Sequence, residues 1–209
     1  MKFAVRALSD LGEDLIFAPE RHQGARIEKG GVCFGDLVTL RTERVLPSAL
    51  SRAAIFDTTH ARDGVLDVFG ALRDVTTAKS AKKRALPGDL VVSRLRPYLR
   101  QIAYVHPEVT RMTQGRLLAL SSEFYVLSPR DGGSDLAFLL PFLLSAETQK
   151  ALAAAQEGGH HPRVPVTSLL ALPVPRAVVA NRARASATVR DRLGAYYRTV
   201  AGLDAVLTL

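Results

Sequence analysis

The chain has 209 residues, 47% of them hydrophobic and 23% charged, which allows one packed domain and excludes a disordered polymer. Its formal charge of +8 favours a polyanionic partner, and its single cysteine, Cys33, excludes an internal disulfide and suits a reducing compartment. Charges within the first twenty residues predict no signal peptide, and no apolar run approaches the ~20 residues of a membrane span, so we expect a soluble, cytoplasmic protein.

Short apolar runs bounded by turn residues predict β-strands in the first two thirds of the chain. Pro87-Gly88-Asp89 is a strong turn signal before one of them. Because the runs are short and irregularly spaced, they predict a small mixed sheet. The expected strands cover 37–40, 53–56, 64–69, 90–92, 102–105 and 124–127.

Helical patterns replace the strand patterns after residue 134. Apolar residues fill 136–144, helix formers fill 146–156, and a shorter helical turn is expected at 167–170. Pro173-Val174-Pro175 predicts a stiff extended hinge. We therefore expect a mixed α/β domain over 1–175 and a C-terminal helical arm over 176–209.

The C-terminal helix carries an apolar row whose steps alternate between three and four residues, as in a coiled-coil seam. The spacing leaves two alternatives open, since the helix can fold back on its own domain or pair with another helix. Spacing slightly favours a partner helix, although two glycines weaken the row. The row consists of Val189, Leu193, Tyr196, Val200, Leu203 and Leu207.

Positive charge gathers in two segments. Residues 182–209 carry a net +3, and residues 79–100 carry seven basic side chains against Asp89 alone. Clustered lysine and arginine is typical of nucleic-acid binding, while the plainer interpretation is a solvated hairpin. The seven residues are Lys79, Lys82, Lys83, Arg84, Arg94, Arg96 and Arg100.

Motifs for catalysis or metal binding are missing from the sequence. It contains no phosphate loop, no dinucleotide fingerprint, no paired cysteine motif and no zinc-protease motif. Adjacent His160 and His161 rarely supply a full ligand set, so we predict no metal site. Ser121-Ser122-Glu123 fits no nuclease pattern, and an enzyme is therefore the weaker hypothesis.

Four segments, in order, resemble the target recognition domain of specificity (S) subunits in type I restriction–modification systems. The first is PGDLVVSRLRPYLRQIA at 87–103, which resembles the family's GD-apolar-apolar-x-S-[KR]-L-R-P-Y-L pattern. The others are SSEFYVLSP at 121–129, FLLPFLLSAETQ at 138–149, and GGHHPRV at 158–164 followed by LPVP at 172–175. The resemblance covers about 35–175.

The chain also departs from the family pattern. A complete S subunit has two recognition domains and two helical regions, whereas this chain has the length of one of each, so it resembles a half-subunit. The family's helix-entry motif after the last proline is replaced by Arg176-Ala177-Val178.

The resemblance implies a non-catalytic subunit that reads one half of a split target in double-stranded DNA. It would direct a separate adenine methyltransferase, which uses S-adenosylmethionine, in DNA methylation and phage defence. No cofactor is expected in this chain. Two copies pairing through their C-terminal helices would rebuild the two-domain arrangement, and contact with the methyltransferase subunit is the other use of that helix.

Site residues divide into phosphate contacts and base readers. Lys79, Lys82, Lys83 and Arg84 suit phosphates, and Arg94, Arg96 and Arg100 belong to the generic segment, where Leu95, Tyr98 and Leu99 are expected in the core. Base readers are expected on three loops, because loops vary most between such domains. These loops carry Thr58, Thr59 and His60; Gln114 and Arg116, suited to adenine and guanine; and His160, His161 and Arg163.

Two other classes of function stay open. One is an interaction or scaffold protein that keeps the domain shape without reading DNA. The other is a nuclease with an unrecognised site, which metal-dependent cleavage of DNA would reveal.

Overall fold

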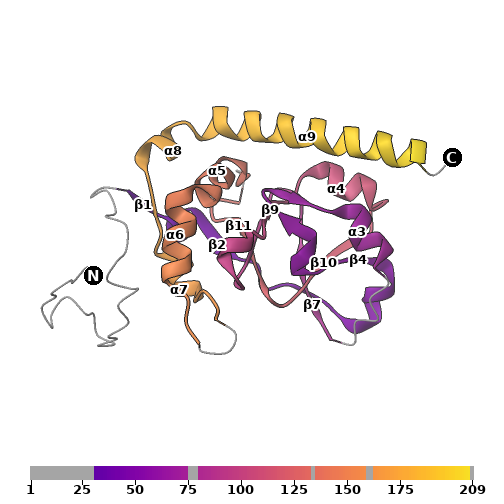
Figure 1. Ribbon diagram of the computed structural model, residues 1–209, viewed down its shortest axis with the longest axis horizontal. Helices are drawn as coiled ribbons and strands as arrows, with labels where there is room; N and C mark the ends of the chain where they lie inside the picture. Colours follow the sequence, from indigo (N-terminus) through magenta and orange to yellow (C-terminus); the bar gives the residue numbers. More distant parts are fainter. Residues whose placement is uncertain (1–30, 75–79, 133–134, 159–161, 208–209) are drawn as a thin grey trace, which may run out of the picture.

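Two four-stranded sheets form the framework of the computed structural model, which describes residues 31–74, 80–132, 135–158 and 162–207 (Figure 1). The first sheet has the order β3 (Arg44–Val45), β7 (Lys82–Ala85), β10 (Leu117–Leu120), β4 (Ala53–Phe56). The second has the order β2 (Val38–Leu40), β11 (Phe124–Pro129), β8 (Leu90–Ser93), β9 (Ile102–Tyr104). Two short pairs complete the sheets: β1 (Val32–Cys33) with β12 (Pro173–Val174), and β5 (Ala61–Arg62) with β6 (Val65–Leu66).

Short helices connect these strands and cover them. The α-helices are α2 (Phe34–Leu37), α3 (Val68–Arg73), α4 (Pro107–Met112), α5 (Leu140–Leu144), α6 (Ala146–Ala154), α7 (Val166–Leu170), α8 (Arg176–Ala180) and α9 (Arg182–Leu207). The 3-10 helices are η2 (Pro47–Arg52), η3 (Thr58–His60), η4 (Pro97–Leu99) and η5 (Ala137–Leu139). None of the helices among the described residues has the length and apolarity to cross a membrane.

The strand pairing is mixed, as the sequence predicted. β10 runs parallel to β4 and antiparallel to β7, whereas every pair in the second sheet is antiparallel. β10 and β11 are joined by the short turn at 121–123, so consecutive strands lie in different sheets. This turn brings the ends of the two sheets together.

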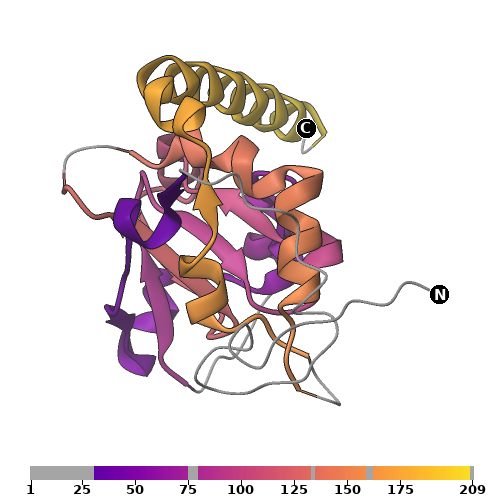
Figure 2. The same ribbon diagram turned by 90° about the vertical axis from the view of Figure 1, so that its left-hand side faces the viewer.

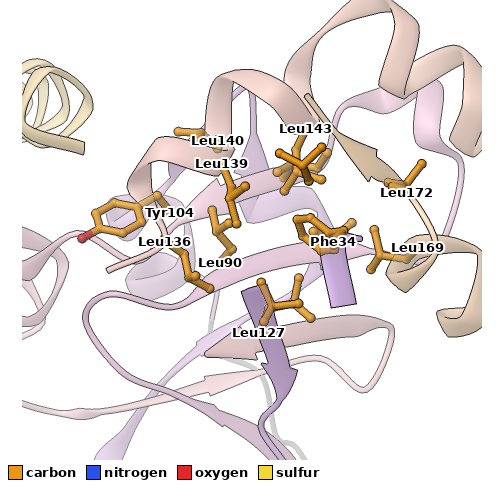
Figure 3. Packing of buried hydrophobic residues seen from close by; sticks show 14 of the residues in the cluster. Phe34, Leu90, Tyr104, Leu127, Leu136, Leu139, Leu140, Leu143, Leu169 and Leu172 are labelled. Carbon is orange, nitrogen blue, oxygen red and sulfur yellow. The ribbon is translucent and has the colours of Figure 1, made fainter. Parts of the chain in front are cut away.

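The second sheet is buried on both faces, which explains its continuous apolar run. Leu90 and Val92 of β8 pack into one core, while Val91 between them packs into the other. In the first core, Phe34 lies among Leu127, Leu143 and Leu169, beneath η5 and α5 (Figure 3). The second core lies between the sheets and α3, α4 and α9.

Most predicted strands are present, but several elements differ from the expectation. The strand predicted at 64–69 ends at Leu66, because the Asp67 side chain accepts a hydrogen bond from Gly70 N and caps α3. Strands β7 and β10 were not predicted. The basic stretch of 82–84 is therefore an inner strand and not a solvated loop.

Helix α9 lies back across its own domain, as a layer over the sheets and shorter helices (Figures 1 and 2). The buried Tyr197 hydroxyl accepts a hydrogen bond from Leu66 N at 2.8 Å, and the Tyr197 ring stacks on His106 at 5.8 Å. Gly194 lies at this contact, and a Cβ there would lie 3.2 Å from the His106 ring, closer than an ordinary van der Waals contact. The glycine that weakens the helix is thus a packing position.

The predicted apolar row on α9 is divided between two environments. Val189 and Leu193 pack on the first core, whereas Tyr196 and Leu203 are 45% and 59% exposed. Val200 is half-buried, and the side chain of Leu207 lies outside the described residues. Packing of α9 on its own domain therefore explains only the first half of the apolar row. The expected boundary between a domain over 1–175 and an arm over 176–209 stays a prediction.

Replacing Tyr197 with Phe should destabilise the fold by about 1–3 kcal/mol, because the buried Leu66 N–H loses its acceptor. Tyr196→Phe, one residue away and exposed, should change the free energy of unfolding by less than about 0.5 kcal/mol. Urea unfolding followed by circular dichroism measures both. Equal effects of the two variants would contradict this account of how α9 is anchored.

Candidate nucleic-acid interface

A single carboxylate holds two arginines at the meeting point of the two sheets. Glu123, in the turn between β10 and β11, accepts hydrogen bonds from Arg94 Nε and Nη2 at 2.8 and 3.1 Å. It also accepts from Arg163 Nε and Nη2 at 3.2 and 3.3 Å. These bonds, those from Arg94 above all, lower the pKa of Glu123 to about 2. Glu123 is therefore ionised at neutral pH, and it fixes the position of both guanidinium groups.

Backbone hydrogen bonds lock the same segments together. Val164 N donates to Arg94 O at 2.8 Å, and Leu95 pairs with Arg163 in an antiparallel bridge. Tyr125 Oη donates to Val164 O at 2.9 Å, and Arg163 exchanges two backbone bonds with Glu157. The segment around Arg163 is thus attached to the chain at the end of β8.

Two further cations lie beside this arrangement. Lys83 of β7 donates to the Phe124 carbonyl and its ammonium lies 5.5 Å from the centre of the Tyr125 ring. Arg44 is its neighbour on β3. Burial, reinforced by the charges of Arg94 and Arg44, lowers the pKa of Lys83. We call Arg44, Lys83, Arg94 and Arg163 the basic cluster; Arg44 was not singled out from the sequence.

Arg84 lies outside this cluster, in a chain of ion pairs. It contacts Glu43 at 2.9 Å, and Glu43 contacts Arg41 at 3.0 Å. Arg41 in turn binds the buried Asp89 through two bonds of 2.8 and 2.9 Å. Arg84 is thereby partly neutralised within the fold. Its neighbour Lys82 is half-buried, and Lys79 lies outside the described residues.

The loop at 58–60 supplies exposed hydroxyls and one buried ring. Thr59 is exposed and Thr58 half-buried, but His60 is buried. Its Nδ1 accepts from Asp57 N at 2.9 Å and its Nε2 lies 3.0 Å from Asp74 Oδ2. The Nδ1 bond caps η3, and the Nε2 contact joins His60 to Asp74 at the end of α3, so both ring nitrogens have structural partners.

Gln114 and Arg116 are exposed but lie away from the basic cluster. The register places Leu117 beside Ala53 and Leu120 beside Phe56, so the loop before β10 is at the opposite end of that strand from Glu123. Gln114 has φ +55° and Gly115 has φ +73°, which together make the tight turn into β10. The three predicted base-reading loops thus do not converge on one place. His160 and His161 of the third loop lie outside the described residues.

The prediction that Tyr98 and Leu99 lie in the core is wrong. They are 68% and 38% exposed, and Pro97 between them and Arg96 is the buried member of the turn. Arg96 is exposed as well. Arg100 pairs with Asp63 and donates to Leu144 O at 2.9 Å, so it anchors the loop to the body of the domain.

In the part of the chain that the structure describes, no group of three or more histidine, cysteine, aspartate or glutamate side chains is placed to hold an ion.

Comparisons with known proteins identify the fold. No protein-family model and no curated protein sequence matches the chain. A chain from a structure concerned with complex assembly and conformational transition of the type I R-M system matches with TM-score 0.53 and 20% identity, over 86% of this chain and 47% of that one. The HsdS subunit from Thermoanaerobacter tengcongensis matches with TM-score 0.49 and 21% identity, over 88% and 48%. The chain therefore spans about half the length of these proteins, and the similarity to the first of them confirms the predicted fold.

Glu123→Gln should destabilise the domain by about 1–2 kcal/mol near pH 7, because two charge-assisted contacts are lost. The pKa of Glu123 is lowered in the folded state, so its contribution is complete above about pH 4.5 and is lost as the pH falls toward 2. The difference in the free energy of unfolding between wild type and variant, measured by urea unfolding, should therefore shrink to zero over that pH range. Glu147→Gln, an exposed site, is the control, and a gap that does not vary with pH contradicts the assignment.

Proposed function

We propose that this chain is a DNA target-recognition module that acts as a specificity-subunit-like component of a type I restriction–modification or related modification and defence complex. The observation that carries the proposal is the basic cluster, which the fold holds at the meeting point of two sheets. The proposal is also supported by the fold, which is similar to that of a chain from a type I R-M system.

Phosphate groups fit the basic cluster by charge. Arg94 and Arg44 each lie close enough to Lys83 to repel its ammonium, and this repulsion adds to burial in lowering the pKa of Lys83. A bound phosphate would relieve the repulsion and favour the charged lysine. Because Glu123 already orients Arg94 and Arg163, little side-chain entropy remains to be lost on binding.

Base reading is assigned to exposed side chains at the two ends of the first sheet. Thr59 lies on the loop that follows β4, at the Glu123 end of the first sheet, and Gln114 and Arg116 lie at the other end. Glutamine and arginine form bidentate contacts with adenine and guanine in the major groove. Separation of these loops would let the module follow one groove over several base pairs.

Catalysis belongs to other subunits in this proposal. The module would hand one half of a split target to an adenine methyltransferase, which binds S-adenosylmethionine itself. The exposed end of α9, with Tyr196, Leu203 and Val206, is proposed as the partner surface, either for a second copy or for the methyltransferase.

DNA affinity should depend strongly on salt. If the basic cluster makes about four phosphate contacts, the slope of log K against log salt should be roughly −3.6. Arg44→Gln with Lys83→Gln should reduce it by roughly 1.8 for every duplex, since glutamine removes charge while keeping a donor for the Phe124 carbonyl. Fluorescence anisotropy measures this. Arg192→Gln, exposed on α9, is the control, and an unchanged slope in the double variant excludes the cluster from the interface.

The exposed end of α9 should mediate self-association. Leu203→Asp with Val206→Asp should convert a dimer into a folded monomer in light scattering, because both side chains are 59–68% exposed and their loss leaves the core intact. Leu46→Asp, exposed on another segment, should leave the dimer unchanged. A wild type that stays monomeric at every concentration would rule out pairing through α9.

A further inference from the structure

The loop at 57–60 begins beside the turn that holds Glu123. Phe56, the last residue of β4, accepts a hydrogen bond of 2.9 Å from the backbone N–H of Ser121, the first residue after β10. The loop that leaves β4 and the turn that leaves β10 therefore start side by side. Later in that turn, Glu123 holds the two arginines of the basic cluster. The loop and the cluster are thus anchored at the same end of the first sheet.

The last residue of this loop, His60, is buried and is bonded to three different parts of the chain. Its Nδ1 accepts a hydrogen bond from Asp57 N at 2.9 Å, and Asp57 Oδ1 accepts one from Thr58 N at 2.7 Å. Its backbone carbonyl accepts from Asp67 N at 2.7 Å, at the start of α3. Its Nε2 lies 3.0 Å from Asp74 Oδ2, at the end of α3. Because Nδ1 is an acceptor, the neutral ring carries its proton on Nε2 and donates it to Asp74.

A histidine at this place does more than close the loop. In a capping box the third residue is usually glutamine or glutamate, whose side chain accepts from the N–H of the capping residue. Here His60 makes that bond to Asp57, and its second nitrogen adds the bond to Asp74. The loop is therefore attached to α3 as well as closed on itself.

The side chain that this fixed loop exposes is a threonine. Thr59 is exposed, whereas Thr58 is half-buried and His60 is 7% exposed. A threonine has one restricted side-chain torsion, so the position of its hydroxyl and methyl groups follows the backbone. A long side chain such as arginine has many rotamers and can adapt to a shifted backbone. Any contact that Thr59 makes with another molecule therefore depends on the group that fixes the loop.

We propose that His60 is a positioning residue for DNA reading, which fixes the loop at 57–60 so that Thr59 contacts one base pair. This inference rests on the proposed DNA-recognition function and deepens it. Threonine can hydrogen-bond to a base edge or pack its methyl group on that of thymine. Such a short contact needs a supporting side chain that is itself locked in place. His60 is locked, because its ring is buried and both ring nitrogens have partners, and for the same reason it does not contact DNA itself.

The test uses the full chain and a duplex chosen by selection from random sequences. Each base pair of that duplex is exchanged in turn, and the affinities are measured by fluorescence anisotropy. Thr59→Ala should abolish a preference of about fivefold at one base pair, the lower end of what a contact between a side chain and a base supplies. His60→Leu should abolish the preference at the same base pair. His60→Gln should keep it, because glutamine also accepts from Asp57 N.

A double-mutant cycle separates positioning from stability. In the Thr59→Ala background, His60→Leu should have no further effect at that base pair, although it still lowers the thermal stability. His106→Leu is the matched control, since His106 is also buried and also caps a helix, accepting from Glu108 N at 3.1 Å, but it packs on α9. It should leave the preference unchanged. If His60→Leu does not fold, Asp74→Ala, which removes a carboxylate that is 64% exposed, replaces it and should reduce the preference about twofold.

The inference is overturned if His60→Leu keeps the wild-type preference at that base pair, or if it weakens binding to every duplex equally. Loss of the same preference in His106→Leu also overturns it, because the effect would then follow from stability. If Thr59→Ala alters no base pair of a site that the wild type selects, the inference fails while the proposed function stands. A wild type that selects no sequence overturns the proposed function itself, and this inference with it.

Discussion

The carboxylate of Glu123 is the interaction on which the candidate interface depends. It lies in the turn where the chain passes from the first sheet to the second, and it binds arginines from two other segments, at 94 and 163. Without it, Arg94, Arg163 and Lys83 would repel one another at the place where the sheet ends meet. The same group therefore closes the fold and keeps positive charge in a fixed arrangement. A cluster held in this way can gain from a bound anion without first having to be ordered.

Burial on both faces of the second sheet explains why the rest of the molecule is arranged around it. Leu90, Val91 and Val92 face alternate cores, so helices must cover one side and the first sheet with α9 the other. The buried Tyr197, bonded to Leu66 N and stacked on His106, attaches α9 to this second core. The helix is thus part of the domain over much of its length. Only its last turns expose large apolar side chains, and a partner surface can be sought there alone.

Sequence patterns predicted most of what depends on apolar runs and on motif order, although they missed the apolar strand β10. The strands at 38–40, 53–56 and 90–93 and the helices after 136 have such patterns, and the four ordered motifs pointed to the fold that the comparisons confirm. Strand β7 was missed because lysine and arginine in a row carry no strand signal, and their pairing depends on β3 and β10. The glycine at 194 predicted only a weaker helix. Its packing against His106 could not be predicted, because the two residues are far apart in the sequence. No sequence pattern singled out Arg44, because its place beside Lys83 depends on the pairing of β3 with β7.

The misplacement of Tyr98 shows where long-range packing overrides local sequence preference. Hydrophobicity alone predicts that a tyrosine and a leucine are buried. A glycine in a sequence can indicate a left-handed backbone, whereas an arginine does not. Two arginines nevertheless adopt that conformation and turn Tyr98 outward, against both local preference and apolar burial. The buried Pro97 and the bonds of Arg100 to Asp63 and to the Leu144 carbonyl hold this conformation. The exposure of Tyr98 is therefore decided by contacts with residues far away in the sequence, which no local pattern encodes.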